Sequence, residues 1–405
     1  MIERWLGQLR SPEGRTSLFY FCFYMGNGAA ASYLPIWLVQ KGVLEDQIGY
    51  INAVPIILMI AINLIVGRIA DRAKDWRQVI VVATAISGLA PLGLFFVSGF
   101  WGILVVYALT MVPLMAAGPV ADAASLRLTR RRGSDFGFIR AWGTVGFMGL
   151  NAATGFLAAA WGAVVFLPIF AGVGLLRAAA ALQLPRFRAE QSEAKSDAAP
   201  KARARLLDAL KPWFVLAIVG AAMLYSCHYL LQGFAALIWK NAGMSEAVIG
   251  PLVAVSAFAE ALMMFGFRRF ASRFSARYLI LAAALTMAAR LAIMAFNPPV
   301  ALLFLLQTLH AITFALGYLG TVNFIANWTS EDIAAEAQSF YVVVVQVVSA
   351  AALIGFGYLT AVAGAGAFLG GAALALAGAV CVIISLRLKS ARREAGETPA
   401  RLSAS

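Results

Sequence analysis

Long apolar runs separated by short polar segments constrain the fold of this chain more than any other feature of its sequence. A helix needs about 20 apolar residues to cross a bilayer, and because no run alternates apolar and polar residues, helices are expected rather than barrel strands. Only 13% of the residues are charged, whereas a soluble domain carries about 25%. We therefore predict an all-α membrane protein with twelve transmembrane helices. The expected spans are residues 16–39, 48–66, 79–99, 101–125, 138–160, 163–183, 213–238, 247–266, 278–296, 300–325, 338–361 and 365–386.

The basic residues are distributed unevenly between the two sides of these spans. The net charge is +13, and 28 of the 32 Lys and Arg residues fall in the N-terminal segment, in every second loop and in the C-terminal segment. Positive charge concentrates on the cytoplasmic side of membrane proteins, which explains the net charge without a nucleic-acid partner. We expect a multi-pass protein of the bacterial cytoplasmic (inner) membrane with both termini in the cytoplasm. Residues 1–15 are polar and basic, so the first span is expected to be retained rather than cleaved.

A polar segment rich in Ala, Glu, Lys, Ser and Arg separates six expected spans from six others. A glycine followed by basic residues recurs after the second and the eighth span, at Gly67 and Gly266, 199 positions apart. Such an internal repeat predicts a binding site near the midplane, between the two halves. The expected bounds are 1–183 for an N-terminal six-helix bundle, 184–212 for a cytoplasmic linker, 213–386 for a C-terminal six-helix bundle and 387–405 for a cytoplasmic tail.

The segment Gly67-Arg68-Ile69-Ala70-Asp71-Arg72 precedes a cluster of basic residues between the second and third spans. Gly67 would let two helices approach closely, and Asp71 could cap a helix or pair with an arginine. The segment resembles the signature loop of the major facilitator superfamily, although Lys74-Asp75 stands where Gly-Arg is usual. We interpret Gly67, Asp71 and Arg72 as a conformational latch on the cytoplasmic side. The alternative is a basic loop that only sets the topology.

Four further segments carry a closer resemblance within that superfamily: Tyr33–Leu38, Ala117–Asp122, Phe136–Gly146 and Gln307–His310. Taken together and in this order, they resemble the lactose permease and phenylpropionate permease branch over essentially the whole chain. The resemblance implies a secondary active transporter that works by alternating access as a proton-coupled symporter. Its partners would be the lipid bilayer, protons and a small organic solute, whether an aromatic acid, a nucleoside or a saccharide. We expect a monomer with no catalytic residues, no cofactor and no metal.

Ionisable side chains inside membrane spans cost free energy and are therefore functional candidates. Asp122 and Arg140 lie at equal distances from a turn at residue 131, so they are expected to face each other. The resemblance implies that this pair contacts substrate, and the planar fork of an arginine suits a carboxylate. The alternative is a structural ion pair at the cytoplasmic rim. The full set within the spans is Asp122, Arg140, Arg177, His228, Glu260, Arg290 and His310.

Three other residues are candidates for the lining of the substrate cavity. His228 could bind substrate or could be a satisfied core histidine, and Asn27 and Trp142 supply a polar and an aromatic group within the spans. Each has packing inside the helix bundle as its alternative. Arg177 lies near the cytoplasmic end of its span, and we expect it to reach the membrane surface.

The resemblance assigns proton coupling to Glu260, Arg290 and His310. Arg290 and His310 lie at equal distances from a turn at residue 300, so similar depths are expected. The carboxylate that the family carries one turn beyond the histidine is Thr313 here, and Leu231 and Gln307 stand where the family has a salt bridge. Glu260 is therefore the expected proton carrier. The alternative is a static Glu260–Arg290 bridge.

Three functions remain open from the sequence. The first is proton-coupled uptake, the second is efflux or facilitated exchange on the same fold, and the third is a sensor or scaffold that does not transport. The ionisable residues within the spans argue against the third, because a protein without transport could lose such costly groups. The direction of transport and the identity of the substrate are not determined by the sequence.

Overall fold

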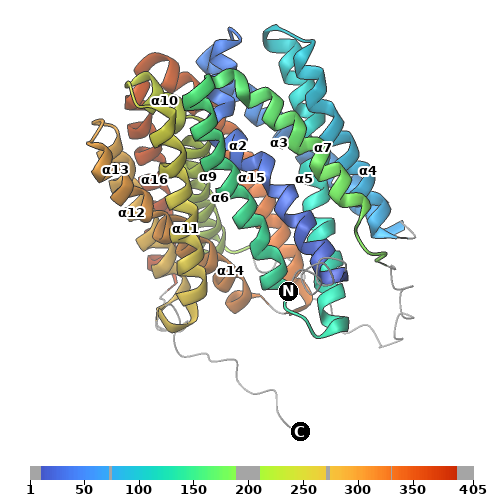
Figure 1. The fold of residues 1–405 in the computed structure, drawn as a ribbon. Coiled ribbons are helices and arrows are strands. Elements are labelled where there is room, and N and C mark those ends of the chain that lie inside the picture. The colour runs from blue at the N-terminus through green and yellow to red at the C-terminus, as the bar shows by residue number, and fades with distance from the viewer. Residues whose placement is uncertain (1–10, 73–74, 188–209, 271–273, 330, 390–405) are drawn as a thin grey trace. The chain divides into compact units, whose positions relative to one another are not determined.

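The computed structural model describes residues 11–72, 75–187, 210–270, 274–329 and 331–389. These residues fold into long helices, and no strand occurs among them (Figure 1). The helices are α2 (Pro12–Gln40), α3 (Glu45–Arg72), α4 (Trp76–Leu89), α5 (Gly99–Arg132), α6 (Phe136–Trp161), α7 (Phe166–Leu182), α9 (Pro212–Gly233), α10 (Ala235–Asn241), α11 (Glu246–Phe270), α12 (Ala276–Met294), α13 (Val300–Thr308), α14 (Gly317–Trp328), α15 (Glu331–Ala363) and α16 (Ala367–Leu388). Short 3-10 turns add Ala90–Phe95, Ala163–Val165 and Gly364–Gly366, and a π-helical turn adds Ala311–Leu316.

Ten segments of the described chain are long and apolar enough to cross a membrane. The last of them, Glu336–Leu388, contains most of α15 and all of α16, which are separated by a turn at Gly364. The helix α2 is not among the ten, because tyrosine, serine, asparagine and glycine lower its hydropathy. The all-α membrane fold is therefore confirmed, and the count of twelve spans stays a prediction.

The expected loop at 67–78 begins later than the sequence suggested. The helix α3 continues through Gly67 to Arg72, so the signature segment forms its last turns. A new helix, α4, then starts at Trp76 behind Asp75, whose carboxylate caps it by accepting the Arg77 backbone N–H at 2.9 Å. The prediction was wrong here because a polar helix end that projects beyond the apolar run looks like a loop in a hydropathy pattern.

The chain divides into two compact units. Unit 1 comprises Met1–Asp197 and Gln232–Ala254, and unit 2 comprises Ala198–Leu231 and Val255–Ser405. Unit 1 thus takes in the end of α9, the short helix α10 and the start of α11. The proposed linker and tail fall largely on residues 188–209 and 390–405, which lie outside the described residues.

Close packing between α2 and α6 holds unit 1 together, and it depends on glycine. A Cβ atom at Gly28 would collide with the Phe147 carbonyl oxygen, and one at Gly146 would collide with the Phe21 carbonyl oxygen. The Asn151 side chain of α6 donates to the Gly28 carbonyl at 2.6 Å and to Ser32 Oγ at 2.8 Å. The two helices therefore touch backbone to backbone, as small residues permit in membranes.

A pair of arginines shows the internal repeat in three dimensions. Arg77, at the start of α4, donates to the carbonyl of Leu182 at the end of α7 at 2.6 Å. Arg277, 200 positions later at the start of α12, donates to the carbonyl of Ser385 near the end of α16 at 2.9 Å. In each unit an arginine thus satisfies free carbonyl groups and the negative dipole end of another helix.

The α2–α6 contact predicts that Gly146→Ala lowers the free energy of unfolding by about 1–3 kcal/mol, the usual cost of overpacking. The added methyl group would meet backbone atoms of α2, which cannot move aside as a side chain could. Thermal unfolding in detergent micelles measures the change. Gly149→Ala on the same helix is the control, because a Cβ there meets nothing within 4 Å. Equal stability of the two variants would contradict the packing described.

Candidate functional site

The hairpin between α5 and α6 in unit 1 positions the first cluster of ionisable residues. The chain leaves α5 at Gly133 in the left-handed conformation (φ 66°), and Asp135 caps α6 by accepting the Gly137 N–H at 2.7 Å. This tight turn places Asp122 and Arg140 side by side, with 3.7 Å between Arg140 Nε and Asp122 Oδ1. The structure therefore brings together the two residues that the symmetry of the hairpin predicted to face each other.

Two tyrosines of α2 complete this cluster. The Tyr20 hydroxyl donates to Asp122 Oδ1 at 2.7 Å and lies 3.3 Å from Ser125 Oγ. The guanidinium carbon of Arg140 lies 4.1 Å from the centre of the Tyr24 ring and 5.5 Å from that of Tyr20. Cation–π contacts of this kind hold a guanidinium in place while leaving its N–H groups available to a ligand.

The exposure of the pair indicates that it faces water. The Asp122 and Arg140 side chains are 44% and 33% exposed, although both lie within apolar helices. Contact of such charges with hydrocarbon would cost several kcal/mol, so a water-filled pathway is the environment that fits them. Asn27, half-buried in α2, and Trp142, exposed on α6, form no hydrogen bond or ion pair with Asp122 or Arg140 in the described part of the chain.

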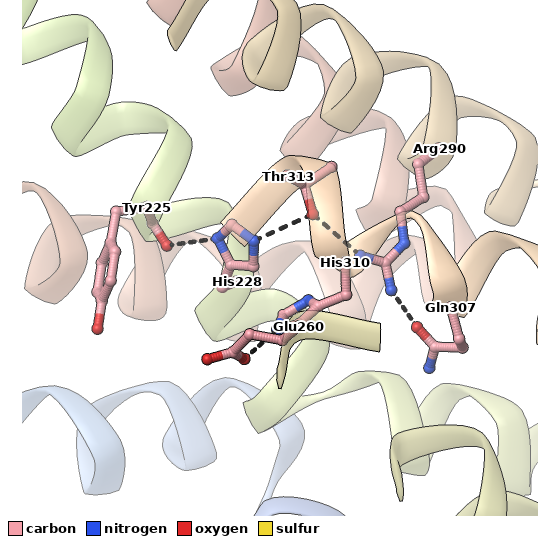
Figure 2. A network of polar contacts seen from close by, with 7 residues as sticks. All are labelled: Tyr225, His228, Glu260, Arg290, Gln307, His310 and Thr313. Atoms are coloured by element: carbon pink, nitrogen blue, oxygen red, sulfur yellow. Dashed lines mark hydrogen bonds and ion pairs between the residues drawn. The ribbon is translucent and has the colours of Figure 1, made fainter. Parts of the chain in front are cut away.

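The second cluster lies in unit 2 and contains both histidines of the chain (Figure 2). His310 Nε2 lies 3.3 Å from Glu260 Oε2, and the two histidine rings meet edge to face with centroids 5.1 Å apart. The Glu260 side chain is 26% exposed and that of His310 is 10% exposed. Glu260 is therefore the member of this pair of ionisable side chains that solvent reaches more easily.

A directed chain of hydrogen bonds runs through the same cluster. Arg290 donates from Nη1 to Thr313 Oγ1 at 3.4 Å and from Nη2 to Gln307 Oε1. The Thr313 hydroxyl lies 3.3 Å from His228 Nε2, and His228 Nδ1 lies 3.2 Å from the Tyr225 carbonyl oxygen. Because Arg290 can only donate and the Tyr225 carbonyl can only accept, the bonds have one consistent direction. Thr313 donates to His228, which is then neutral and protonated on Nδ1.

An irregular turn of the backbone between α13 and α14 positions two members of this cluster. The segment Ala311–Leu316 is π-helical and begins directly after His310. Wider turns of this kind inside helices occur often at functional sites. This one carries Thr313 toward Arg290 and His228 (Figure 2) and stacks the Phe314 ring on that of His310, with centroids 5.2 Å apart and planes 9° apart.

The structure relates these residues differently from the sequence expectation in one respect. Glu260 pairs with His310, while the hydrogen bonds of Arg290 go to the neutral side chains of Gln307 and Thr313. From the sequence, Gln307 and Thr313 were interpreted only as residues that stand where the family has charged side chains. The signal that could have identified their role was the arginine itself, since a buried guanidinium needs several acceptors and two polar residues follow it in the next helices.

Arg177 does not reach the membrane surface as expected. Its side chain is 2% exposed and donates to the Ser87 carbonyl at 2.9 Å and to Ser87 Oγ at 3.1 Å. The guanidinium of Arg177 therefore finds its hydrogen-bond acceptors inside the protein and not at the membrane surface. The side chains of the proposed latch, Gly67, Asp71 and Arg72, lie outside the described residues.

A family model described as the MFS_1 like family matches residues 14–380. The chain belongs to this family. It is therefore a transporter of the major facilitator superfamily and not an enzyme, and relatives of this kind move small solutes across a membrane. Among the curated relatives is the probable 3-phenylpropionic acid transporter of Escherichia coli (strain K12), 26% identical over 319 residues, which cover 76% of this chain and 81% of the relative. The maltose permease of Geobacillus stearothermophilus is 26% identical over 326 residues, which cover 80% and 81%.

Solved structures of transporters share the fold of this family member. The crystal structure of the nucleoside transporter NupG has a TM-score of 0.78 and 16% identity, covering 93% of this chain and 99% of that one. That of a D-xylose–proton symporter has a TM-score of 0.69 and 15% identity, covering 94% and 97%. Identities this low show the fold alone.

The directed hydrogen-bond chain predicts that Thr313→Val lowers the free energy of unfolding by about 1–3 kcal/mol, because an Arg290 N–H and His228 Nε2 lose a buried partner. Valine has nearly the shape of threonine, so packing changes little. Thermal unfolding in micelles measures the loss, and Thr313→Ser, which keeps the hydroxyl, should stay closer to the native protein. If valine and serine had the same effect, the hydroxyl would not be the linking group.

Proposed function

We propose that the protein is a proton-coupled symporter that moves a small aromatic carboxylic acid across the bacterial inner membrane by alternating access. The observation that carries this proposal is the close contact of the ionisable side chains of Glu260 and His310, 3.3 Å apart and largely enclosed within unit 2. Ionisable pairs at such depth are typical of proton relays in transporters. A sensor or scaffold that does not transport would not need such a costly pair of ionisable side chains.

The proton would enter and leave through Glu260, the more exposed partner. With one proton added, the pair exists either as carboxylate and imidazolium or as carboxylic acid and imidazole, and both forms have no net charge. Without that proton the pair is negative. Loading therefore changes the charge of the cluster by one unit, and a neighbouring charge of the substrate can respond to it.

The fixed charge of Arg290 favours an anionic substrate. Arg290 is 1% exposed and its hydrogen bonds go to neutral acceptors, while His228 is held neutral by Thr313. The network in Figure 2 thus has no net charge when the proton is absent and one positive charge when it is present. A substrate carboxylate offsets that charge, so proton and acid would move together without net charge.

Aromatic side chains beside both clusters support an aromatic acid. Phe314 stacks on His310 and on Tyr318, with ring centroids 5.2 Å and 6.3 Å apart. In unit 1, Arg140 lies over Tyr24 and offers a planar fork to a carboxylate. The likeness to a probable 3-phenylpropionic acid transporter favours the same class. Saccharides, which the likeness to a maltose permease suggests, and nucleosides, which the sequence left open, serve as the competing outcomes.

The remaining expectations complete this proposal. The excess of Lys and Arg in alternate loops supports cytoplasmic termini. Two six-helix halves joined by the 184–212 segment would provide the rocking units of alternating access. Gly67, Asp71 and Arg72 would form the cytoplasmic latch, and His228, Asn27 and Trp142 would line the substrate path. A single chain is sufficient for these roles.

A close contact within unit 1 supports a gate on the side opposite the basic loops. Gly155 of α6 and Gly250 of α11 leave so little room that a Cβ at Gly155 would lie 2.6 Å from the Tyr33 hydroxyl. That hydroxyl donates to the Glu246 carbonyl at 3.1 Å. We propose that substrate passes when this contact between α6 and the start of α11 opens and closes.

A second candidate function is exchange or uniport, and Thr313 favours it. A hydroxyl stands where the family carries a carboxylate, and it is engaged with His228 and Arg290. If Glu260 and His310 form a static bridge, substrate moves without a proton. Transport measurements separate this function from symport.

The symport proposal predicts that an aromatic acid such as 3-phenylpropionate, added to de-energised vesicles, produces an alkaline shift outside. In proteoliposomes with an imposed proton gradient, Glu260→Gln should abolish uphill uptake but keep exchange down a gradient, because the neutral amide cannot release a proton. Glu336→Gln, an exposed carboxylate on α15, is the control and should retain uphill uptake. Tracer movement without any pH change would instead indicate exchange or uniport. Full uphill uptake by Glu260→Gln would show that Glu260 does not carry the proton.

The gate proposal predicts that Gly155→Leu slows transport more than tenfold while substrate still protects the protein against thermal unfolding. The larger side chain prevents closure of the contact with Tyr33 and Gly250 but leaves both ionisable clusters intact. Gly149→Leu is the control on the same helix, since the space beside Gly149 is open. Native transport rates in Gly155→Leu would show that this contact need not close.

A further inference from the structure

The hydroxyl of Tyr20, in the first ionisable cluster, has no part in the proposed movement of proton or substrate. Tyr20 is 1% exposed, and its ring packs edge to face against Phe19 and Phe136, with centroids 5.8 Å and 6.4 Å apart. The hydroxyl donates to Asp122 Oδ1 at 2.7 Å, and it lies 3.3 Å from Ser125 Oγ. The aromatic packing therefore fixes this hydroxyl against a carboxylate that is 44% exposed.

The same carboxylate does not form a hydrogen bond with the arginine beside it. Arg140 Nε lies 3.7 Å from Asp122 Oδ1, beyond the roughly 2.7–3.2 Å of an N–H···O bond. Within the described part of the chain, the Arg140 guanidinium donates no hydrogen bond at all. Packing holds it instead, because its carbon lies 4.1 Å from the centre of the Tyr24 ring and a Cβ at Gly143 would lie 3.0 Å from Nη1. The guanidinium is thus fixed in place with its donors available.

The bond from Tyr20 accounts for this arrangement. A carboxylate and a guanidinium that meet freely form two parallel N–H···O bonds, which engage both carboxylate oxygens. One of those oxygens, Asp122 Oδ1, is already held by Tyr20 from α2, and the 2.7 Å bond is shorter than the 3.7 Å separation from Arg140. Asp122 therefore balances the charge of Arg140 from a distance, without occupying its fork of N–H groups.

We propose that Tyr20 is a positioning residue that holds Asp122 away from the fork of Arg140, so that the fork stays available to the carboxylate of a substrate. The carboxylate ligand rests on the proposed function, whereas the placement of Asp122 rests only on these contacts. Without the Tyr20 hydroxyl, Asp122 turns to Arg140 and forms both bonds. An acid must then displace a carboxylate that is already bound, while a neutral solute meets no such competitor. Tyr20 thereby sets a preference for acids.

The first measurement needs no substrate. Phenylglyoxal reacts with guanidinium groups, and peptide mass spectrometry gives its rate at Arg140 in the full-length protein in detergent. Tyr20→Phe should slow this reaction about fivefold, since a hydrogen-bonded guanidinium is less available. Tyr20→Phe combined with Asp122→Asn should restore the native rate, because the amide carries no charge to hold the arginine. Tyr20→Phe reacting at the native rate would overturn the positioning role, whatever the substrate.

Two further variants control this measurement. Tyr107→Phe alters another buried tyrosine of unit 1, whose hydroxyl forms no hydrogen bond with the described residues, and it should react as the native protein does. Asp122→Asn alone should also stay close to the native rate, because Asp122 does not occupy the fork. A severalfold faster reaction in Asp122→Asn would contradict the proposal even if Tyr20→Phe failed to fold.

The second measurement tests the preference for acids. Calorimetry compares 3-phenylpropionate with its neutral amide on the native protein and the same variants. Tyr20→Phe should bind the acid about tenfold more weakly, the equivalent of about 1.4 kcal/mol, with the affinity for the amide unchanged, and the double variant should recover the acid. Equal weakening of acid and amide would reduce Tyr20 to a structural role. If the native protein binds neither while the Arg140 rates change as expected, the aromatic-acid function fails and the positioning of Asp122 stands.

Discussion

A guanidinium group buried in a membrane protein must find its hydrogen-bond acceptors within the protein, and this requirement shapes the packing of both units. Among the described residues, the three largest fully buried side chains are those of Arg177, Arg277 and Arg290. Their acceptors are mostly neutral: serine and threonine hydroxyls, a glutamine side chain and carbonyl groups at helix ends. Because neutral acceptors leave the positive charge in place, Arg290 remains able to attract an anion.

The two ionisable clusters differ in a way that suits different tasks. Asp122 and Arg140 are partly exposed and are framed by tyrosines, so a solute can reach them from water. Glu260 and His310 are more enclosed and touch a hydrogen-bonded chain that holds the second histidine neutral. A proton added in this enclosed setting acts strongly on neighbouring charges, since the low dielectric constant weakens screening. Under the proposed function, the exposed pair of unit 1 would contact the substrate and the enclosed pair of unit 2 would bind the proton.

Much of this arrangement could be predicted from the sequence wherever the argument rested on distance along a helix. The Asp122–Arg140 pair followed from equal distances to a turn. The repeat offset of 199 is close to the 200 positions between the two arginines that the structure shows at helix ends. Predictions that depended on which side chains share a partner were less successful. Arg177 was expected at the membrane surface, and Thr313 was regarded only as a missing carboxylate, whereas both prove to be parts of buried hydrogen-bond networks.

The sequence by itself determined that the chain is helical and lies in a membrane, and which ionisable residues are placed within its spans. The reason is that apolar length and charge position along the chain are enough to decide how a segment meets lipid. Only the tertiary structure decided that His310 pairs with Glu260, that Thr313 joins Arg290 to His228, and that a π-helical turn carries Thr313 to that position. These partners come from different helices, and their choice depends on how those helices rotate and pack, which no periodicity within a single helix records.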